Sequence, residues 1–237
     1  MFKFLRFVMF FLALASLLVF VVLPAAISPL LTQYVRDMGV SADDLSVSID
    51  TFDPALLSGR AGRLHVQGTN VEIGRARVGE LDVTLGDVSF FDRSFQSLSG
   101  QLDDVAVRAG GASASALQVN VLGPSGEASA TGHFDSQQSE DMIMAAARRM
   151  GVPLDHANVV DGGLRLSAGG FEVSAGIAVE GGALVLRPQF GDPILLLQPA
   201  TSDPWRLEEA FVTSAGITVR GTVDAAFIAR GMAQPEK

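Results

Sequence analysis

Apolar and polar side chains alternate with a period of two over most of the chain from Leu45 onward. Successive side chains of a β-strand point to opposite faces of the sheet, so this pattern predicts strands with one apolar and one polar face. The clearest runs are 45–49, 64–66, 71–73, 81–85, 105–107, 117–121, 164–166, 173–179, 184–186 and 217–223. We therefore expect at least eight strands in an antiparallel sheet with one solvated face.

Glycines mark the ends of several runs. Gly169-Gly170 and Gly181-Gly182 each separate two apolar runs by two residues, which predicts β-hairpin turns. After Gly86-Asp87 the alternation resumes at Val88 and Phe90 in shifted parity, which indicates a bulge or a turn.

One helix interrupts the strands. We expect it to begin at Ser139 as the N-cap, with Glu140 and Asp141 in its first turn. Its last turn holds Arg148 and Arg149, and Gly151 and Pro153 follow it. At helical spacing, Met142, Ile143, Ala146, Ala147 and Met150 share one face, which we expect to border the apolar interior, while Arg148 faces water.

A single short helix cannot cover the apolar faces of eight strands. Such a sheet must close on itself, pack against a second sheet or hold another apolar molecule.

The N-terminal segment predicts a membrane anchor. Residues 7–23 carry no charge, and with 25–27 they reach the ~20 residues that cross a bilayer. Lys3 and Arg6 precede them, which places the N-terminus in the cytoplasm and the rest on the outer (extracytoplasmic or periplasmic) face. A cleaved signal peptide is the alternative. We expect residues 1–27 to form a single-pass anchor, 28–40 an amphipathic linker helix, 41–230 the β-rich domain and 231–237 a disordered tail.

Charge and composition exclude several functions. Without Lys3 and Arg6 the chain has 15 basic and 26 acidic side chains, a net charge of −11, which argues against a nucleic-acid partner. There is no cysteine, and the three histidines lack the spacing of a zinc site or an obvious catalytic partner. We expect no enzymatic activity, no metal and no cofactor. One segment is locally positive because it holds Arg60, Arg63, Arg75 and Arg77, which would bind a lipid phosphate or form a solvated strand face.

Four stretches of the chain carry a family resemblance. They are LLSGR at 56–60 with the alternating run to residue 90, SEDMIMAAARRMGVPL at 139–154, DGGLRLSAGGFEVSAGIAVEGGALVLRP at 161–188 and WRLEEAFVTSAGITVRGTVD at 205–224. In their order and spacing these stretches resemble the LmeA-like phospholipid-binding proteins of bacterial cell envelopes. The resemblance covers roughly residues 41–228 and departs most between Val105 and Gly132. It implies a mainly β (α+β) fold of the tubular lipid-binding type, in which an elongated, curled antiparallel sheet or partial barrel with one or two helices encloses acyl chains.

The resemblance and the alternation together predict a membrane-anchored phospholipid-binding protein of the cell envelope. The expected lipid contacts are Leu56, Leu57, Leu64, Val66, Leu81, Val83, Leu85, Phe90, Met142, Ile143, Ala146, Met150, Leu184 and Leu186, and the expected headgroup contacts are the four arginines. For each apolar side chain, a place in a closed β core is the alternative. A structural or adaptor domain of an envelope assembly, with a filled core, is the alternative function.

Overall fold

A computed structural model of the chain describes residues 40–49, 56, 58–73, 76–92, 94–109, 112–160 and 162–227, with Pro29, Thr32, Gln33 and Arg36. Its strands are β1 (Asp44–Ser48), β2 (Arg60–Ile73), β3 (Ala76–Ser89), β4 (Ser97–Ala109), β5 (Ala112–Pro124), β6 (Ala128–Asp135), β7 (His156–Val160), β8 (Gly163–Ala168), β9 (Phe171–Glu180), β10 (Ala183–Pro188), β11 (Ile194–Leu197), β12 (Trp205–Thr213) and β13 (Gly216–Val223), and helix α3 spans Ser136–Arg149. The predicted mainly β character is confirmed. The predicted anchor, 1–27, and tail, 231–237, lie outside the described residues, and Pro29, Thr32, Gln33 and Arg36 within the predicted linker are helical.

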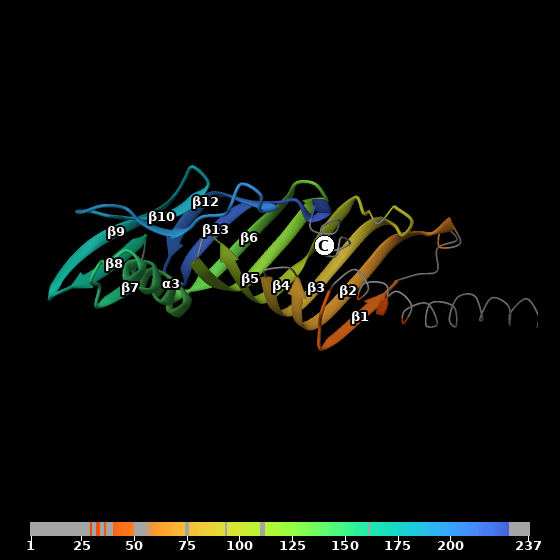
Figure 1. Ribbon diagram of the computed structural model, residues 1–237, viewed down its shortest axis with the longest axis horizontal. Coiled ribbons are helices and arrows are strands. Elements are labelled where there is room, and N and C mark those ends of the chain that lie inside the picture. The colour runs from red at the N-terminus through yellow and green to blue at the C-terminus, as the bar shows by residue number, and fades with distance from the viewer. Residues whose placement is uncertain are drawn as a thin grey trace, which may run out of the picture.

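The strands form two antiparallel sheets. The larger sheet has the order β1-β2-β3-β4-β5-β6-β13-β12, and the smaller has the order β11-β10-β9-β8-β7. The chain therefore leaves the larger sheet after β6, builds α3 and the smaller sheet, and returns to pair β13 with β6. The molecule is elongated, with β1 towards one end and the smaller sheet at the other (Figure 1).

The two glycine pairs make the predicted hairpin turns. Gly169 and Gly170 connect β8 to β9 with φ of 56° and 84°. Gly181 and Gly182 connect β9 to β10 with φ of 58° and 80°. Positive φ at both central residues matches the right-handed twist of the flanking strands and favours glycine. Both turn predictions are confirmed.

In the long strands β2 to β4, the alternation of side chains between the two faces of the sheet shifts by one residue at positions with left-handed backbone. Asn70, Asp87 and Asp104 have φ of 49°, 52° and 52°. At Asp87 the pairing with β2 continues in one register, because Arg63 faces Gly86 and Ala61 faces Val88. The expected bulge or turn at Gly86-Asp87 is therefore a single left-handed residue inside β3. It moves Val88 onto the apolar face without interrupting the strand.

Helix α3 begins earlier than the sequence pattern predicted. Asp135 is the N-cap, where its Oδ1 accepts from the Gln138 backbone N–H at 2.7 Å and its own N–H donates to Gln138 Oε1 at 3.2 Å. This capping box satisfies two backbone donors and starts the helix four residues before the expected cap. The prediction of Ser139 as N-cap is wrong: Ser139 is fully buried within the helix, and Glu140 lies beyond its first turn.

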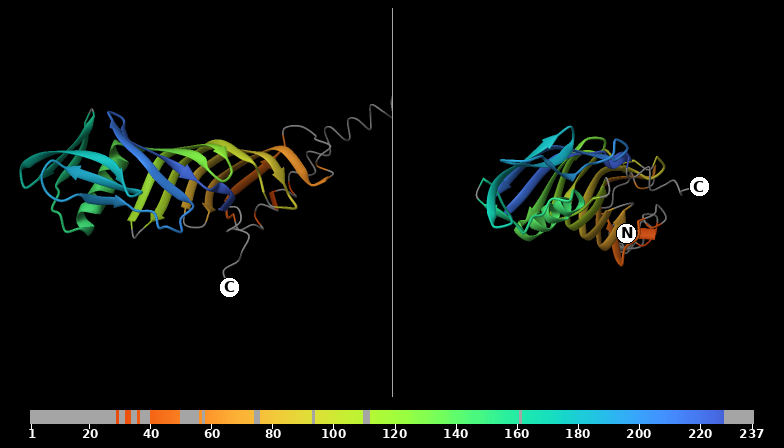
Figure 2. Two further views of the ribbon diagram at one scale, coloured as in Figure 1. Left: turned by 90° about the horizontal axis from the view of Figure 1, so that it is seen from above. Right: turned by 60° about the vertical axis from the view of Figure 1, so that its left-hand side comes forward.

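The core has three apolar clusters. The helix cluster joins α3 and the smaller sheet to the far ends of β2–β5 and to β12–β13, and includes Ile143, Leu186 and Ile217. The edge cluster lies on β1–β3 around Val47 and Leu64. The central cluster lies on β3–β6 around Val83 and Val121. The larger sheet is curved along its length, and α3 lies at the end that holds the smaller sheet (Figure 2).

Candidate functional site

The apolar face of the larger sheet is continuous from β1 to the smaller sheet. Leu81 on β3 packs against all three clusters, and it pairs with Gly68 on β2 and Leu102 on β4. Leu102 and Val119 each pack against both the helix and the central clusters. The strands thus present one connected apolar surface, which we call the inner face.

The inner face is covered unevenly. Near α3 the smaller sheet lies over it, and β12 contacts β7, β8, β9 and β10. In the described part of the chain, the edge and central clusters contain no residue of the smaller sheet or of α3. Phe95, from the β3–β4 connection, packs on both clusters instead, and Phe90 packs on the edge cluster. Leu81, Leu85, Leu102 and Val119 remain partly exposed, so this half of the inner face offers apolar surface to a ligand.

The predicted lipid contacts fall into two groups. On the larger sheet, Leu64, Val66 and Val83 are almost fully buried, at 3%, 7% and 8% exposure. Leu56, Leu81, Leu85 and Phe90 are partly exposed on the same clusters. At the helix end, Ile143, Ala146, Leu184 and Leu186 have no exposed surface, and Met142 has 5%. Those five side chains pack on protein atoms in the helix cluster, so a lipid would reach them only if that core opened. Leu57 lies outside the described residues.

Met150 does not border the interior. It is the C-cap of α3 and is 48% exposed, because the helix ends at Arg149 and the chain turns away through Gly151 with φ of 72°. The prediction that Met150 shares the buried face is wrong. Arg148 is exposed as predicted, and its Nε donates to the Met144 carbonyl oxygen at 3.2 Å.

The four arginines do not form one cluster. Arg60 and Arg63 lie at the start of β2, whereas Arg77 lies opposite Glu72, near the end of β2, and forms an ion pair with it. Arg60 and Glu72 are twelve residues apart along the strand, roughly 40 Å at about 3.3 Å per residue. Arg75 lies outside the described residues. The expectation that all four arginines contact a lipid phosphate together is wrong, because an extended hairpin separates Arg60 from Arg77.

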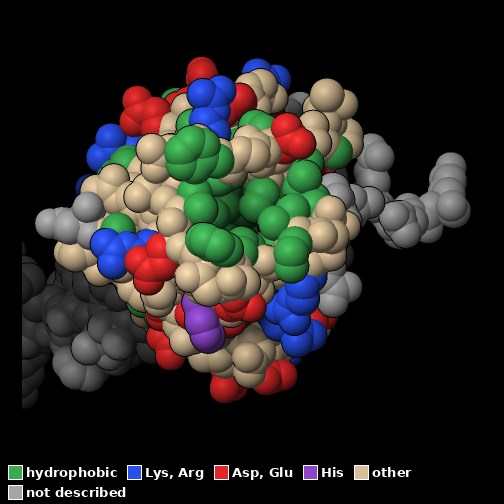
Figure 3. Space-filling model, turned by 90° about the vertical axis from the view of Figure 1, so that its left-hand side faces the viewer, with side chains coloured by type: hydrophobic (Ala, Val, Ile, Leu, Met, Phe, Trp, Pro, Cys, Tyr) green, Lys and Arg blue, Asp and Glu red, His purple; other side chains and the backbone are tan. Residues whose placement is uncertain are grey.

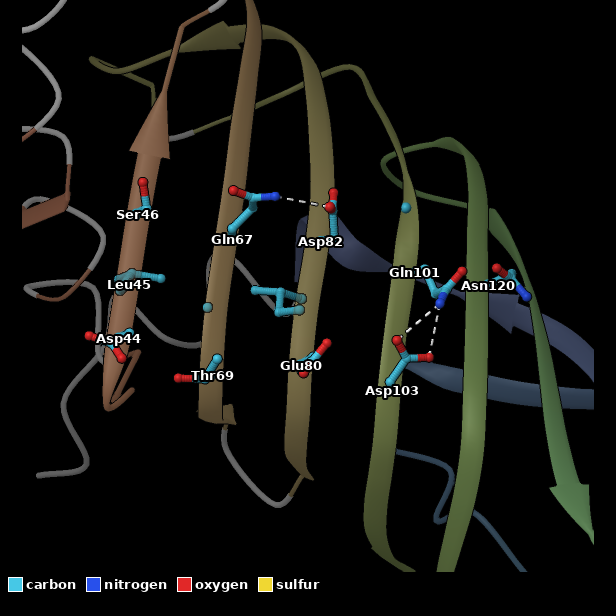
Figure 4. A pocket seen from close by; sticks show the side chains of 13 residues that line it. Asp44, Leu45, Ser46, Gln67, Thr69, Glu80, Asp82, Gln101, Asp103 and Asn120 are labelled. Carbon is cyan, nitrogen blue, oxygen red and sulfur yellow. Dashed lines mark hydrogen bonds between the residues drawn. The ribbon is translucent and has the colours of Figure 1, made fainter.

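Polar positions of the larger sheet line a groove that the sequence analysis did not predict. It has a volume of about 890 Å³, and its lining includes Asp44, Glu80, Asp82 and Asp103, together with Leu45 and Leu81, but no lysine or arginine. Gln67, Asp82, Gln101 and Asn120 line it in register across β2–β5 (Figure 4). Gln67 Nε2 donates to Asp82 Oδ2 at 3.1 Å, and Gln101 Nε2 donates to Asp103 Oδ2 at 2.9 Å. These residues are the polar positions of the alternation, and only strand pairing shows that they gather.

One ion pair on the smaller sheet shifts the pKa of both of its members. The Arg187 guanidinium on β10 hydrogen-bonds to the Glu180 carboxylate on β9 and lowers the pKa of that carboxyl. The same contact raises the pKa of Arg187. Both side chains are solvated, so the pair is a surface contact.

Comparison with protein-family models, with curated proteins and with solved structures found no match to this chain. No helix of the described residues is both long and apolar enough to cross a membrane.

Proposed function

We propose that this chain binds a phospholipid in the cell envelope, with the acyl chains on the inner face and residues 1–27 as a single-pass anchor in the cytoplasmic membrane. The observation that carries the proposal is the inner face itself. It is connected through Leu81 to all three clusters, and it keeps partly exposed leucine and valine side chains over β3–β5. The resemblance to the LmeA-like proteins supports the same function.

The hydrophobic effect supplies enough free energy for such binding. Each buried methylene contributes about 0.8 kcal/mol, so about ten methylenes on the inner face would contribute roughly 8 kcal/mol before the cost of ordering the lipid. Apolar contact alone would therefore hold a lipid without a specific headgroup site. Arg60 and Arg63 are the remaining candidates for a phosphate contact, since both are exposed on β2.

A structural or adaptor domain is the second candidate, and a specific observation favours it. Phe95 already packs on the edge and central clusters and Phe90 on the edge cluster, as they would in a protein whose core is complete. The two functions differ in one measurable property, because an adaptor with a filled core would carry no lipid.

The test is native mass spectrometry of the full chain purified from membranes. We expect bound phospholipid on the native chain and strongly reduced loading on the double variant Leu81→Gln/Leu102→Gln, which places two amides on the inner face. Leu122→Gln is the matched control. Leu122 is 67% exposed, between Ser99 and Ser129 on the polar face of β5. A native chain without lipid, or equal loading in all variants, would refute the proposal.

A further inference from the structure

The apolar face of the smaller sheet runs out of the core towards one end of the molecule. Along β9, alternate residues on this face pass from Ala175, 7% exposed, through partly exposed Val173 to Phe171, 78% exposed. Neighbouring β8 changes in the same direction, from Leu164 at 1% and Leu166 at 3% to partly exposed Ala168. Since Ala168 pairs with Phe171, the two strands open at the same end.

A second exposed phenylalanine lies at this end. Pro188 pairs with Ala175, and Gln189 N–H donates to the Ser174 carbonyl oxygen at 2.8 Å, so the chain reaches the level of Val173 at Phe190. Phe190 is 74% exposed and precedes Gly191 in a bend. Phe171 directly follows the turn at Gly169-Gly170. Viewed from this end, hydrophobic side chains surround a hollow, and charged side chains lie around them (Figure 3).

Charges around this end are largely paired within the protein. Arg165 Nε lies 3.6 Å from Glu172 Oε2. Arg187, next to Pro188, pairs with Glu180, which lies at the other end of β9 from Phe171. Asp155 Oδ2 accepts from the Gly169 N–H at 2.8 Å. Counted with Asp192 and with Glu140, whose Oε1 lies 3.5 Å from His156 Nδ1, these groups give a small net negative charge. Attraction to anionic phosphates therefore cannot drive binding here, and a partner must be held by apolar contact.

We propose that this end of the molecule docks on a phospholipid bilayer that is zwitterionic at its surface, with Phe171 and Phe190 inserted among the acyl chains. The inference rests on the proposed function and names the surface with which the inner face would exchange lipid. Two protruding phenylalanines on separate turns need no complementary surface in a bilayer, whose acyl chains can also fill the hollow. The weak local charge fits zwitterionic headgroups.

This bilayer is a different one from the bilayer in which the N-terminal anchor would lie. The first strand, β1, and the smaller sheet lie towards opposite ends of the molecule (Figure 1). The larger sheet alone has eight strands, which at about 4.8 Å between neighbours span roughly 34 Å from β1 to β12.

Docking is tested on the full chain reconstituted in nanodiscs and mixed with phosphatidylcholine vesicles. We expect the nanodiscs to float with the vesicles, and Phe171→Ser and Phe190→Ser each to reduce the partition coefficient about tenfold, or about 1.4 kcal/mol. Phe91→Ser is the matched control, since Phe91 is 80% exposed in the β3–β4 connection. Binding should persist in high salt, because it is apolar. The inference would be overturned if the partition coefficient fell equally in all three variants, or if the native chain did not bind the vesicles.

A second measurement locates the contact. The chain has no cysteine, so Phe171→Cys and Phe91→Cys each give a single site for an environment-sensitive fluorophore. Brominated lipid in the vesicles should quench the label at 171 and leave the label at 91 unchanged. Quenching only by brominated lipid in the nanodisc, or at neither site, would refute docking on a second bilayer. Lipid loading is measured separately by native mass spectrometry, so failure to dock is distinguishable from failure to bind lipid.

Discussion

Substitution of Gly79 should reveal how tightly strands β2, β3 and β4 pack at the level where their side chains switch from one face of the sheet to the other. Gly79 lies between left-handed Asn70 on β2 and left-handed Asp104 on β4. A Cβ atom at Gly79 would lie 2.9 Å from Asp104 Cβ and 3.3 Å from Asp104 Oδ2. Because the first distance is shorter than real contacts allow, Gly79→Ala must displace Asp104. We expect a loss of about 1–3 kcal/mol in the free energy of unfolding, as for other overpacked sites.

A second substitution should remove this cost. Asp104→Gly deletes both crowding atoms, and glycine adopts the φ of 52° at this position without steric penalty. The next atom near a Cβ at residue 79 is the Asp103 carbonyl oxygen at 3.4 Å, an ordinary contact. We therefore expect Asp104→Gly alone to stay within about 1 kcal/mol of the native chain. The double variant should be about as stable as Asp104→Gly, which corresponds to a coupling equal to the full cost of Gly79→Ala, about 1–3 kcal/mol.

The assay is urea unfolding of the full chain, followed by fluorescence of Trp205, the single tryptophan. Gly176→Ala is the control, because a Cβ at that glycine in β9 meets no atom within 4 Å. That variant should be unchanged or slightly stabilised. If the costs of Gly79→Ala and Asp104→Gly add to within about 0.5 kcal/mol in the double variant, the two sites are independent. The explanation that Gly79→Ala is costly because its Cβ collides with Asp104 would then be wrong.

Three further predictions follow from single contacts. Asp135→Ala removes the capping box of α3 and should lower the free energy of unfolding by about 1 kcal/mol in urea titrations. Ile143→Asp puts a charge at a side chain with no exposed surface and should abolish cooperative unfolding, whereas Met150→Asp, at a 48% exposed position, should cost less than about 1 kcal/mol. The lowered pKa of Glu180 stabilises the native state above its ordinary value of 4.5, and this contribution disappears as pH falls through the lowered value. Arg187→Gln should therefore make the urea midpoint less sensitive to acid, and an unchanged acid profile would contradict the pairing.

The sequence predicted strands and tight turns well, because each of these has one strongly preferred backbone geometry. Period-two alternation predicted the strands, and two-residue glycine pairs predicted the hairpins at 169–170 and 181–182. The helix was predicted, but its start was wrong, because Asp135 and Gln138 form a capping box that competes with Ser139. Met150 matched the helical period, yet the helix ends one residue before it. Helix ends depend on which cap forms, and periodicity alone does not decide that.

The candidate site was predicted only in part. The pattern identified Leu81 and Leu85 as members of an apolar face, but it treated Leu184 and Leu186 as equivalent to them. In the structure the first pair is partly exposed and the second pair is fully buried in the helix cluster. The pattern does not contain this difference, because exposure depends on which element packs on a residue.

By itself, the sequence determined which face of each strand is apolar and where the tight turns fall, because side-chain direction and turn geometry follow from a few neighbouring residues. Tertiary structure alone decided that β13 returns to pair with β6 and that the smaller sheet covers one end of the inner face. It also separated Arg60 from Arg77 and gathered Asp82 and Asp103 into one groove. These arrangements join residues far apart in the chain, and they depend on the free energy of packing whole elements together, which no local pattern records.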